Sequence, residues 1–503
     1  GDHRDLHSFP TRRSSDLSAL LAVMMLLAMT GIAMADAVPT GSITVENLEP
    51  GETVTIYQVI EIESDGTAAL KDPKWVSGIQ TWITTTYSEY ADAANLPADG
   101  SATVSKSTFY NALSGQLASL TAVKNEQVSA TTYTVENLPI GSYMVLVMGG
   151  EKAHEAYLTS IRATKYDFDK AEWVVESGVV NAAAKCKTPD VEKKEDKTTA
   201  AIGDKVTFTV DSDVPTYPAS AYDVAYELED TMAEGLTFND DLKAYGINAN
   251  GKKELTPGTE FKADYTQSTT DGKTTIFKLK FDYSLIKDYT KIELVYSATV
   301  NEKIKIGSNQ NTNEVKFTYD HKEKSSYTVL YSFGFDLTKR ADSQTGELLA
   351  GAEFELSQAG KALKFKKLSD GHYAVDPAGE AKLVTGAEGK MKGKIIVDGL
   401  DVGDYTLKET KAPDNFNLMQ GEKDVIITQN GEAQEKHLLA NTNNKENSKS
   451  AYWYQTVVDK RISGLPATGG MGTTIFMVAG IAVMACAVVA LMVVLKRQKR
   501  SEG

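Results

Sequence analysis

Short runs of alternating apolar and polar residues recur through most of this 503-residue chain. Successive side chains of a β-strand point to opposite faces, so such a run buries one face and exposes the other. Many short alternating strands separated by glycine, asparagine and aspartate are typical of β-sandwiches. We therefore predict an all-β chain of tandem sandwiches, with helical interruptions at 79–95 and 109–120. The clearest strand candidates are GSITVENL, ETVTIYQVIEI, KVTFTV, KIELVYSATV, EVKFTY, AEFELSQ and KDVIITQ.

The chain is too long for one domain, and its length suggests about three. Two charged stretches, 185–197 and 320–326, interrupt the strand pattern and indicate boundaries. The expected domains are an N-terminal domain at 38–184, a middle sandwich at 188–325 and a C-terminal sandwich at 328–462.

The net charge and the cysteine content indicate which partners and which sources of stability these domains can have. The formal net charge is −15, which argues against a nucleic-acid or anionic-membrane partner. Only two cysteines are present, Cys186 and Cys486, and Cys486 lies in an apolar run. The remaining part therefore has one thiol and no intramolecular disulfide, so a secreted form of this chain needs another source of stability.

Conventional enzyme motifs are missing from the sequence. We find no HExxH, GxSxG, phosphate-binding loop or CxxC. The histidines of the expected domains are not spaced as metal ligands; they are His154, His321, His372 and His437. We expect no metal, no cofactor and no conventional active site.

The N-terminal segment divides into two parts. Residues 18–37 contain a short apolar run that ends in the small-x-small pattern Ala33-Met34-Ala35, which is typical of a signal peptide. Residues 1–17 are too acidic for the basic start of a signal peptide. We interpret them as an artefact or non-native start and exclude them from the fold.

The C-terminal segment carries the most specific signal. The motif at 465–469 is followed by an apolar run at 471–495, long enough to span a bilayer, and by a basic tail at 496–503. The basic cluster places the tail in the cytoplasm. The alternative is a plain single-span anchor. The motif residues are Leu465, Pro466, Ala467, Thr468 and Gly469.

This order of parts resembles the LPXTG-type sorting signal of Gram-positive surface proteins. The resemblance implies that a sortase cysteine attacks the carbonyl of Thr468 and releases the tail from Gly469. The protein would then be secreted and covalently anchored in the cell wall.

Five ionisable or amide side chains share a strand face with apolar residues. Burial of such groups is costly unless they are paired. They form two sets, each with a lysine in an early strand, and each set belongs to one expected domain. Solvent-reaching positions at strand ends remain the alternative for any single one. The five are Lys193, Asp230, Asn313, Lys339 and Glu409.

One chemistry uses these parts together. Burial lowers the pKa of a lysine and raises the pKa of a carboxyl group, so the amine becomes a nucleophile and the acid can polarise an amide. Held in contact, the lysine can attack an asparagine carbonyl and expel ammonia. The resulting isopeptide bond would constrain the unfolded chain as a disulfide does.

Further motifs make the family resemblance specific. The segment 405–413, YTLKETKAP, resembles the E-box of Gram-positive pilins, and LTKRADSQTGELLAGAEFEL resembles a collagen-adhesin B-type domain. The middle domain, with VEKK, LEDTMAEGLTF and NEVKFTY, resembles the second domain of fimbrial backbone proteins. The resemblance implies immunoglobulin-like (Cna A/B-type) sandwiches.

The same resemblance implies two cross-links. One joins Lys193 to Asn313, with Asp230 as the catalytic acid. The other starts from Lys339, with Glu409 as the catalytic acid. The family usually places an asparagine six residues before the sorting-signal leucine, where this chain has Asp459.

A bond from Lys339 to Asp459 is chemically feasible, because water can leave in place of ammonia. Asn441 or Asn443 could substitute, although the polar loop around them argues against it. In the first domain, Val147 occupies the place of the E-box glutamate, and no lysine lies on the opening strand. We expect no cross-link there.

A pilus shaft subunit also needs an acceptor amine. In pilins it is a lysine near the end of the first domain, and Lys185 fits this place, with Lys187 as a rival. The motif is degraded, since Ala183 and Ala184 replace the usual Tyr and Pro. An ordinary solvated linker lysine remains the alternative.

The leading hypothesis is the backbone subunit of a sortase-assembled pilus, or fimbrium. Its implied partners are a pilus-type (class C) sortase, a housekeeping sortase, peptidoglycan, copies of itself joined head to tail, and minor pilins. Host surface or matrix proteins are further candidate partners. The alternative is a monomeric wall-anchored adhesin or a minor pilus subunit, and a surface enzyme comes a distant third.

Overall fold

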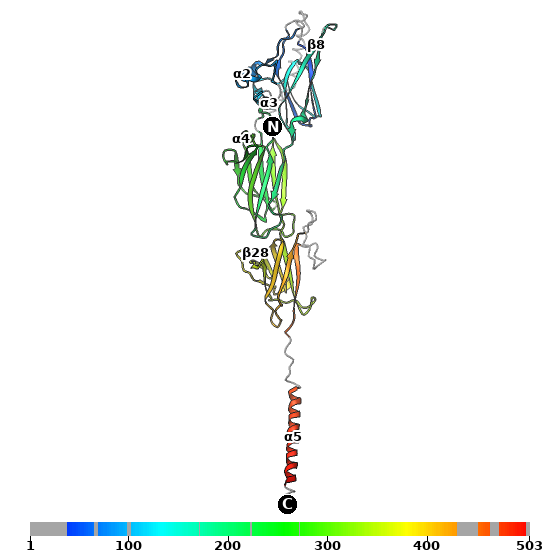
Figure 1. The fold of residues 1–503 in the computed structure, drawn as a ribbon, viewed down its shortest axis with the longest axis vertical. Helices are drawn as coiled ribbons and strands as arrows, with labels where there is room; N and C mark the ends of the chain where they lie inside the picture. The colour runs from blue at the N-terminus through cyan, green and yellow to red at the C-terminus, as the bar shows by residue number, and fades with distance from the viewer. Residues whose placement is uncertain are drawn as a thin grey trace, which may run out of the picture.

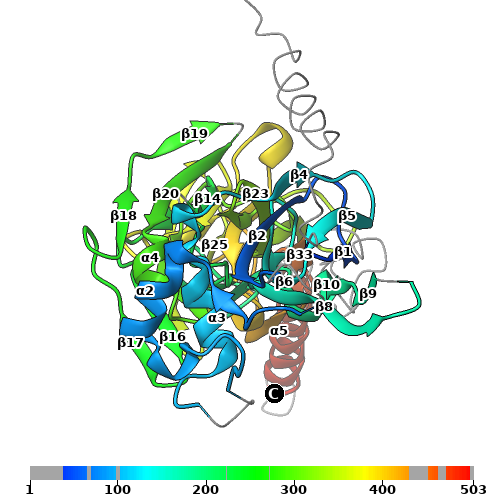
Figure 2. The same ribbon diagram turned by 90° about the horizontal axis from the view of Figure 1, so that it is seen from above.

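The computed structural model describes residues 38–64, 69–97, 102–170, 172–221, 224–270, 272–429, 451–462 and 472–498. Most of their regular structure is β-strand, in three groups of sheets that follow one another along the long axis (Figure 1). Seen along that axis, the groups overlap (Figure 2). The predicted all-β class with tandem domains is confirmed. The expected leader and the sorting motif lie outside the described residues.

The N-terminal group has two main sheets, ordered β10-β1-β5 and β3-β2-β6-β8-β9, and β4 also pairs with β2. A short pair, β11 with β7, lies at its end. The strands are β1 (Thr40–Glu46), β2 (Thr53–Glu61), β3 (Lys74–Trp75), β4 (Lys124–Gln127), β5 (Thr132–Pro139), β6 (Gly141–Met148), β7 (Ala153–His154), β8 (Tyr157–Asp167), β9 (Glu172–Glu176), β10 (Gly178–Asn181) and β11 (Cys186–Lys187).

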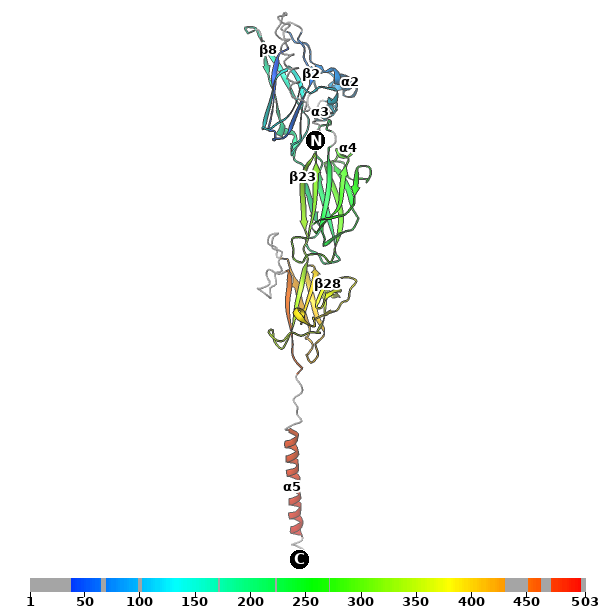
Figure 3. The ribbon, with the colours of Figure 1, turned by 180° about the vertical axis from the view of Figure 1, so that it is seen from behind.

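Helices cover one face of this group, as seen from both sides in Figures 1 and 3. β6 is buried on both faces, because Met144 packs in the helical cluster and Val145 packs between the sheets. This explains its nearly continuous apolar sequence. The Ser105 hydroxyl caps α3 by accepting from the Thr108 amide at 3.2 Å. The helices are α2 (Ser77–Thr86), η2 (Ser88–Tyr90), α3 (Lys106–Ser114), η3 (Leu117–Ser119) and η4 (Ala182–Lys185).

The middle group is a sandwich of two six-stranded sheets around one apolar core. One sheet runs β12-β13-β21-β16-β17 with β15 paired to β21, and the other runs β18-β20-β14-β22-β23 with β19 paired to β20. Its elements are β12 (Val191–Glu195), β13 (Lys205–Asp213), β14 (Tyr226–Ala233), β15 (Leu236–Phe238), β16 (Lys243–Asn248), β17 (Gly251–Glu254), β18 (Phe261–Asp264), β19 (Ser268–Thr270), β20 (Lys273–Phe281), α4 (Tyr283–Ile286), β21 (Lys291–Val300), β22 (Thr312–Tyr319) and β23 (Lys322–Val329).

The C-terminal group is a sandwich of two five-stranded sheets. One runs β27-β28-β30-β24-β33, and the other runs β26-β25-β31-β32 with β29 paired to β25. Its elements are β24 (Phe333–Ala341), β25 (Glu353–Gln358), β26 (Lys361–Ala362), β27 (Phe365–Ser369), β28 (His372–Val375), β29 (Leu383–Val384), η5 (Gly389–Met391), β30 (Lys394–Leu400), β31 (Gly403–Lys411), β32 (Glu422–Ile427) and β33 (Tyr452–Asp459).

Neighbouring groups are joined by direct contacts. The Tyr319 hydroxyl donates to the Glu151 carbonyl at 3.2 Å across the first junction, and the Ile202 amide donates to the Gly399 carbonyl at 2.9 Å across the second. β23 runs to Val329, four residues past the expected end of the middle domain at 325. The charged stretch at 320–326 therefore forms the turn at 320–321 and the first part of β23, which pairs with β22.

The described C-terminal segment is the helix α5 (Gly472–Gln498), whose stretch Ile475–Gln498 is long and apolar enough to cross a membrane. None of that stretch is buried within the protein. Lys496 and Arg497 occupy its last turn, so the expected tail begins inside the helix.

Candidate functional site

The Lys193 set lies in the core of the middle sandwich and is contributed by both sheets. Lys193 is on β12 in one sheet, and Asp230 and Asn313 are on β14 and β22, which are neighbours in the other. Alternation along each strand turns these polar side chains inward with the apolar ones. All three residues are at most 5% exposed. The structure therefore brings together the three side chains expected from the sequence.

Their contacts are short and mutual. The Lys193 ammonium contacts Asp230 Oδ2 and lies 2.7 Å from Asn313 Oδ1. The hydroxyl of Tyr296, on β21, lies 2.6 Å from Lys193 Nζ and 2.7 Å from Asp230 Oδ2. The ring of Phe208 lies 5.7 Å from the same nitrogen. A lysine, an acid and an amide carbonyl thus meet in an apolar enclosure.

Burial shifts the proton affinities of this pair in opposite directions. It lowers the pKa of Lys193 to about 8, although Asp230 opposes the shift. It raises the pKa of Asp230, although Lys193 and Tyr296 oppose that shift. Asp230 Oδ1 is buried and has no hydrogen-bond partner among the described residues, which further disfavours the carboxylate. Both shifts favour the uncharged forms, so the pair can exist as a neutral amine beside a neutral carboxylic acid.

The Lys339 set lies in the core of the C-terminal sandwich. Lys339 on β24 and Asp459 on β33 come from adjacent parallel strands, and Glu409 comes from β31 in the opposite sheet. The Lys339 ammonium contacts Asp459 Oδ1 and lies 2.8 Å from Glu409 Oε1. All three residues are at most 2% exposed.

The burial of Glu409 favours its protonated form. Burial raises its pKa, although Lys339 and a hydrogen bond from the Met419 amide to Oε2 at 2.7 Å oppose the shift. Its second oxygen faces the Lys339 amine. Asn441 and Asn443, the alternative partners of Lys339, lie outside the described residues.

The first domain has a different buried polar cluster. Val147 occupies a core position, and β1 carries no lysine, as read from the sequence. Glu52 and His154 are both at most 1% exposed, and His154 Nε2 lies 2.8 Å from Glu52 Oε1. His154 Nδ1 lies 3.1 Å from the hydroxyl of Tyr157. Sequence reasoning did not predict this cluster, because Glu52 lies 102 residues before His154 along the chain.

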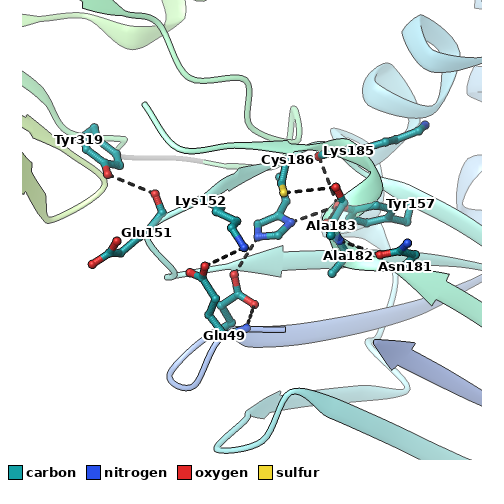
Figure 4. Close-up of polar contacts among 12 residues, drawn as sticks. Glu49, Glu151, Lys152, Tyr157, Asn181, Ala182, Ala183, Lys185, Cys186 and Tyr319 are labelled. Carbon is teal, nitrogen blue, oxygen red and sulfur yellow. Dashed lines mark hydrogen bonds and ion pairs between the residues drawn. The ribbon is translucent and has the colours of Figure 1, made fainter. Parts of the chain in front are cut away.

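The cluster supports the backbone that carries Lys185 (Figure 4). The Tyr157 hydroxyl donates to the carbonyl of Ala182 at 2.6 Å and lies 3.3 Å from that of Lys185. The Lys185 side chain points away from the cluster and is exposed. Lys187 is also exposed, but its ammonium pairs with Asp213 of the middle domain at 2.9 Å.

Two contributors to the sites were not anticipated. Tyr296 touches every member of the Lys193 set, and the backbone amide of Met419 holds Glu409. A tyrosine at an inward position of KIELVYSATV was a possible signal, because a buried hydroxyl needs a partner. Among the described residues, no group of three His, Cys, Asp or Glu side chains is arranged to hold a metal ion.

The chain is similar in sequence to known proteins. Residues 335–441 match the family profile described as "SpaA: Prealbumin-like fold domain". The trypsin-resistant surface T6 protein of Streptococcus pyogenes serotype M6 is 22% identical over 446 residues, which cover 80% of this chain and 74% of the T6 protein.

Solved structures extend the comparison. The T6 backbone pilin of serotype M6 Streptococcus pyogenes, a modular three-domain protein, matches with a TM-score of 0.50 at 16% identity, covering 84% of this chain and 99% of the pilin. The major pilin SpaD of Corynebacterium diphtheriae matches with a TM-score of 0.46 at 18% identity, covering 86% and 100%. The C-terminal sandwich therefore contains the match to a SpaA prealbumin-like domain, and the comparisons confirm the predicted resemblance of the chain to Gram-positive pilus backbone proteins.

Proposed function

We propose that this chain is the shaft subunit of a sortase-assembled pilus on a Gram-positive cell wall, stabilised by two intramolecular isopeptide bonds. The observation that carries the proposal is the pair of buried lysine-centred sets, one in each of the last two domains. A buried charge network of this kind is a poor source of stability by itself. It is well suited to a reaction that consumes the charges.

In the middle domain the reaction joins Lys193 to Asn313. A proton passes from the Lys193 ammonium to the Asp230 carboxylate within the buried pair, which leaves a neutral amine beside a carboxylic acid. The amine attacks the side-chain carbonyl carbon of Asn313, and ammonia leaves. The fixed contact of 2.7 Å between Nζ and Oδ1 supports this step, because proximity replaces an external catalyst.

In the C-terminal domain Lys339 would react with Asp459. The leaving group is water, because the attacked group is a carboxylic acid. Glu409, whose pKa is raised by burial, supplies and recovers the proton. The bond would connect the first and last strands of the sandwich, β24 and β33.

Assembly needs an acyl donor and an acceptor amine. We propose Thr468 as the donor and Lys185 as the acceptor. Lys187 is the weaker candidate, because its amine already pairs with Asp213. A pilus-type sortase would join copies head to tail, and a housekeeping sortase would transfer the finished fibre to peptidoglycan. A donor and an acceptor far apart along the chain favour an open fibre over a closed ring.

An immunoblot of cell-wall extract tests the proposal. A ladder of high-mass species is expected from a polymerised shaft subunit, whereas a single wall-linked band would support the monomeric adhesin. The same extract from a strain without the pilus-type sortase should lose the ladder. Minor pilins and host surface proteins are further candidate partners.

A further inference from the structure

Tyr296 occupies the centre of the middle-domain set. Its hydroxyl accepts from Lys193 Nζ at 2.6 Å and from Asn313 Nδ2 at 3.0 Å, and it donates to Asp230 Oδ2 at 2.7 Å. A tyrosine hydroxyl has one proton and two lone pairs, so these contacts use its full capacity. The amine, the acid and the leaving nitrogen therefore share one oxygen.

The packing of the Tyr296 ring fixes the position of its hydroxyl. Tyr296 is 1% exposed, and its ring packs 5.6 Å from Phe208 and 5.2 Å from Phe277. Burial raises the pKa of the hydroxyl well above its ordinary range, so it keeps its proton unless another arrives as the first departs.

The proposed isopeptide reaction leaves one proton transfer without a carrier. The nitrogen of Asn313 must gain a proton before it can leave as ammonia. Among the described residues, the hydrogen-bond partners of Asp230 Oδ2 are Lys193 and Tyr296, and Oδ1 has none. The acid thus has no direct hydrogen bond to the group that needs its proton.

We propose that Tyr296 is a catalytic residue that relays a proton from Asp230 to Nδ2 of Asn313 during isopeptide formation. This role rests on the proposed Lys193–Asn313 bond. An amide nitrogen is a poor acceptor while it is planar, and it gains a lone pair when the carbonyl carbon becomes tetrahedral. The relay therefore operates only after the amine has attacked.

The lone pair of Lys193 Nζ forms a bond to Cγ of Asn313, and the carbonyl electrons move to Oδ1. Asp230 gives its proton to the Tyr296 oxygen while the Tyr296 proton passes to Nδ2. The cationic Nζ then returns a proton to Asp230, the electrons on Oδ1 reform the carbonyl, and ammonia leaves with the Cγ–Nδ2 electron pair.

The C-terminal set provides an internal contrast. Within the described residues, Lys339 Nζ contacts the carboxyl groups of Glu409 and Asp459, and no hydroxyl bridges them. The group that leaves there is water rather than ammonia, so no amide nitrogen has to be protonated. The relay should matter for the middle-domain bond alone.

The test compares Tyr296→Phe with Tyr226→Phe. Tyr226 is a matched control, because it is equally buried in the same sandwich, and its hydroxyl bonds to Ser212 at 2.6 Å, outside the reactive set. The full-length chains are made by cell-free synthesis with detergent, and the cross-linked peptides are followed over time by mass spectrometry. Tyr296→Phe should slow the middle-domain bond by roughly 10²–10⁴-fold, the usual contribution of general acid catalysis.

Two readouts separate a relay from a packing role. The C-terminal bond of the same molecules should form at the wild-type rate, which shows that the effect is confined to the middle domain. A plot of the wild-type rate of bond formation against the fraction of D₂O should be curved, because two protons move in the same step. The same plot for Tyr296→Phe should be a straight line. An unchanged rate in Tyr296→Phe, a straight line in both proteins, or an equal loss in Tyr226→Phe would overturn the relay. A wild-type chain that forms no middle-domain bond would instead overturn the proposed function.

Discussion

Replacing Lys193 with methionine should remove the middle-domain cross-link and leave the rest of the protein intact. Methionine keeps an unbranched apolar stem in the core. Burial raises the pKa of Asp230, and removing the lysine takes away a group that opposes this shift, so the uncharged acid is favoured in the variant. Lys194→Met is a matched control on the same strand. Lys194 is exposed and pairs with Glu192, an interaction worth little.

The expected loss follows from the loop that the bond closes. Lys193 and Asn313 are 120 residues apart, and closing a loop of this length is worth about 5 kcal/mol in the chain-entropy model. For a domain of this size, each kcal/mol moves the melting temperature by about 3 °C. The middle-domain transition should therefore fall by about 15 °C in Lys193→Met and by less than about 2 °C in Lys194→Met.

Differential scanning calorimetry and intact-protein mass spectrometry measure the two consequences together. The C-terminal transition should stay in place, because its cross-link is separate, and the mass should show that one ammonia is retained. A Lys193→Met protein that melts like the wild type would refute the stabilising role of the bond. A wild-type mass that already contains this ammonia would refute the bond itself.

Three further outcomes are expected. Glu409→Ala should abolish the C-terminal bond and spare the middle one, so that the mass deficit shrinks by one water; an unchanged mass would remove Glu409 from the mechanism. Lys185→Ala should collapse the pilus ladder on an immunoblot to wall-anchored monomer, while Lys187→Ala should leave it intact; the reverse result would exchange their roles. The reactive form of the Lys193–Asp230 pair is a neutral amine beside a protonated acid, so the pair must hold one titratable proton. Because the pKa of Lys193 is lowered to about 8, the pair loses this proton above about pH 8, and the rate of bond formation should fall there. A rate that rises through pH 9 and 10 would contradict this proton count.

The inward-facing polar side chains could be predicted because strand alternation is a local rule. In FDLTK, Lys339 follows Phe335 and Leu337 on one face, and the structure buries all three. The same rule placed Asp230 and Asn313 in the core. The alternation of side chains along single strands was therefore enough to predict most residues of the candidate sites.

Other features depend on contacts that no local pattern encodes. Tyr296 looks like an ordinary core aromatic in its strand, and its role arises only because β21 faces β14 and β22 across the sandwich. Glu52 and His154 meet across 102 residues. The continuation of β23 to Val329 was hidden by its charged sequence, since an edge strand with one exposed face tolerates charge.

Intact-protein mass spectrometry of the recombinant segment 36–464 shows whether the two buried lysines are cross-linked. We predict a mass below that of the sequence by one ammonia plus one water, from the Lys193–Asn313 and Lys339–Asp459 bonds. A deficit of two ammonias would move the C-terminal partner from Asp459 to an asparagine. The full sequence mass would contradict the claim that these buried lysines form covalent cross-links.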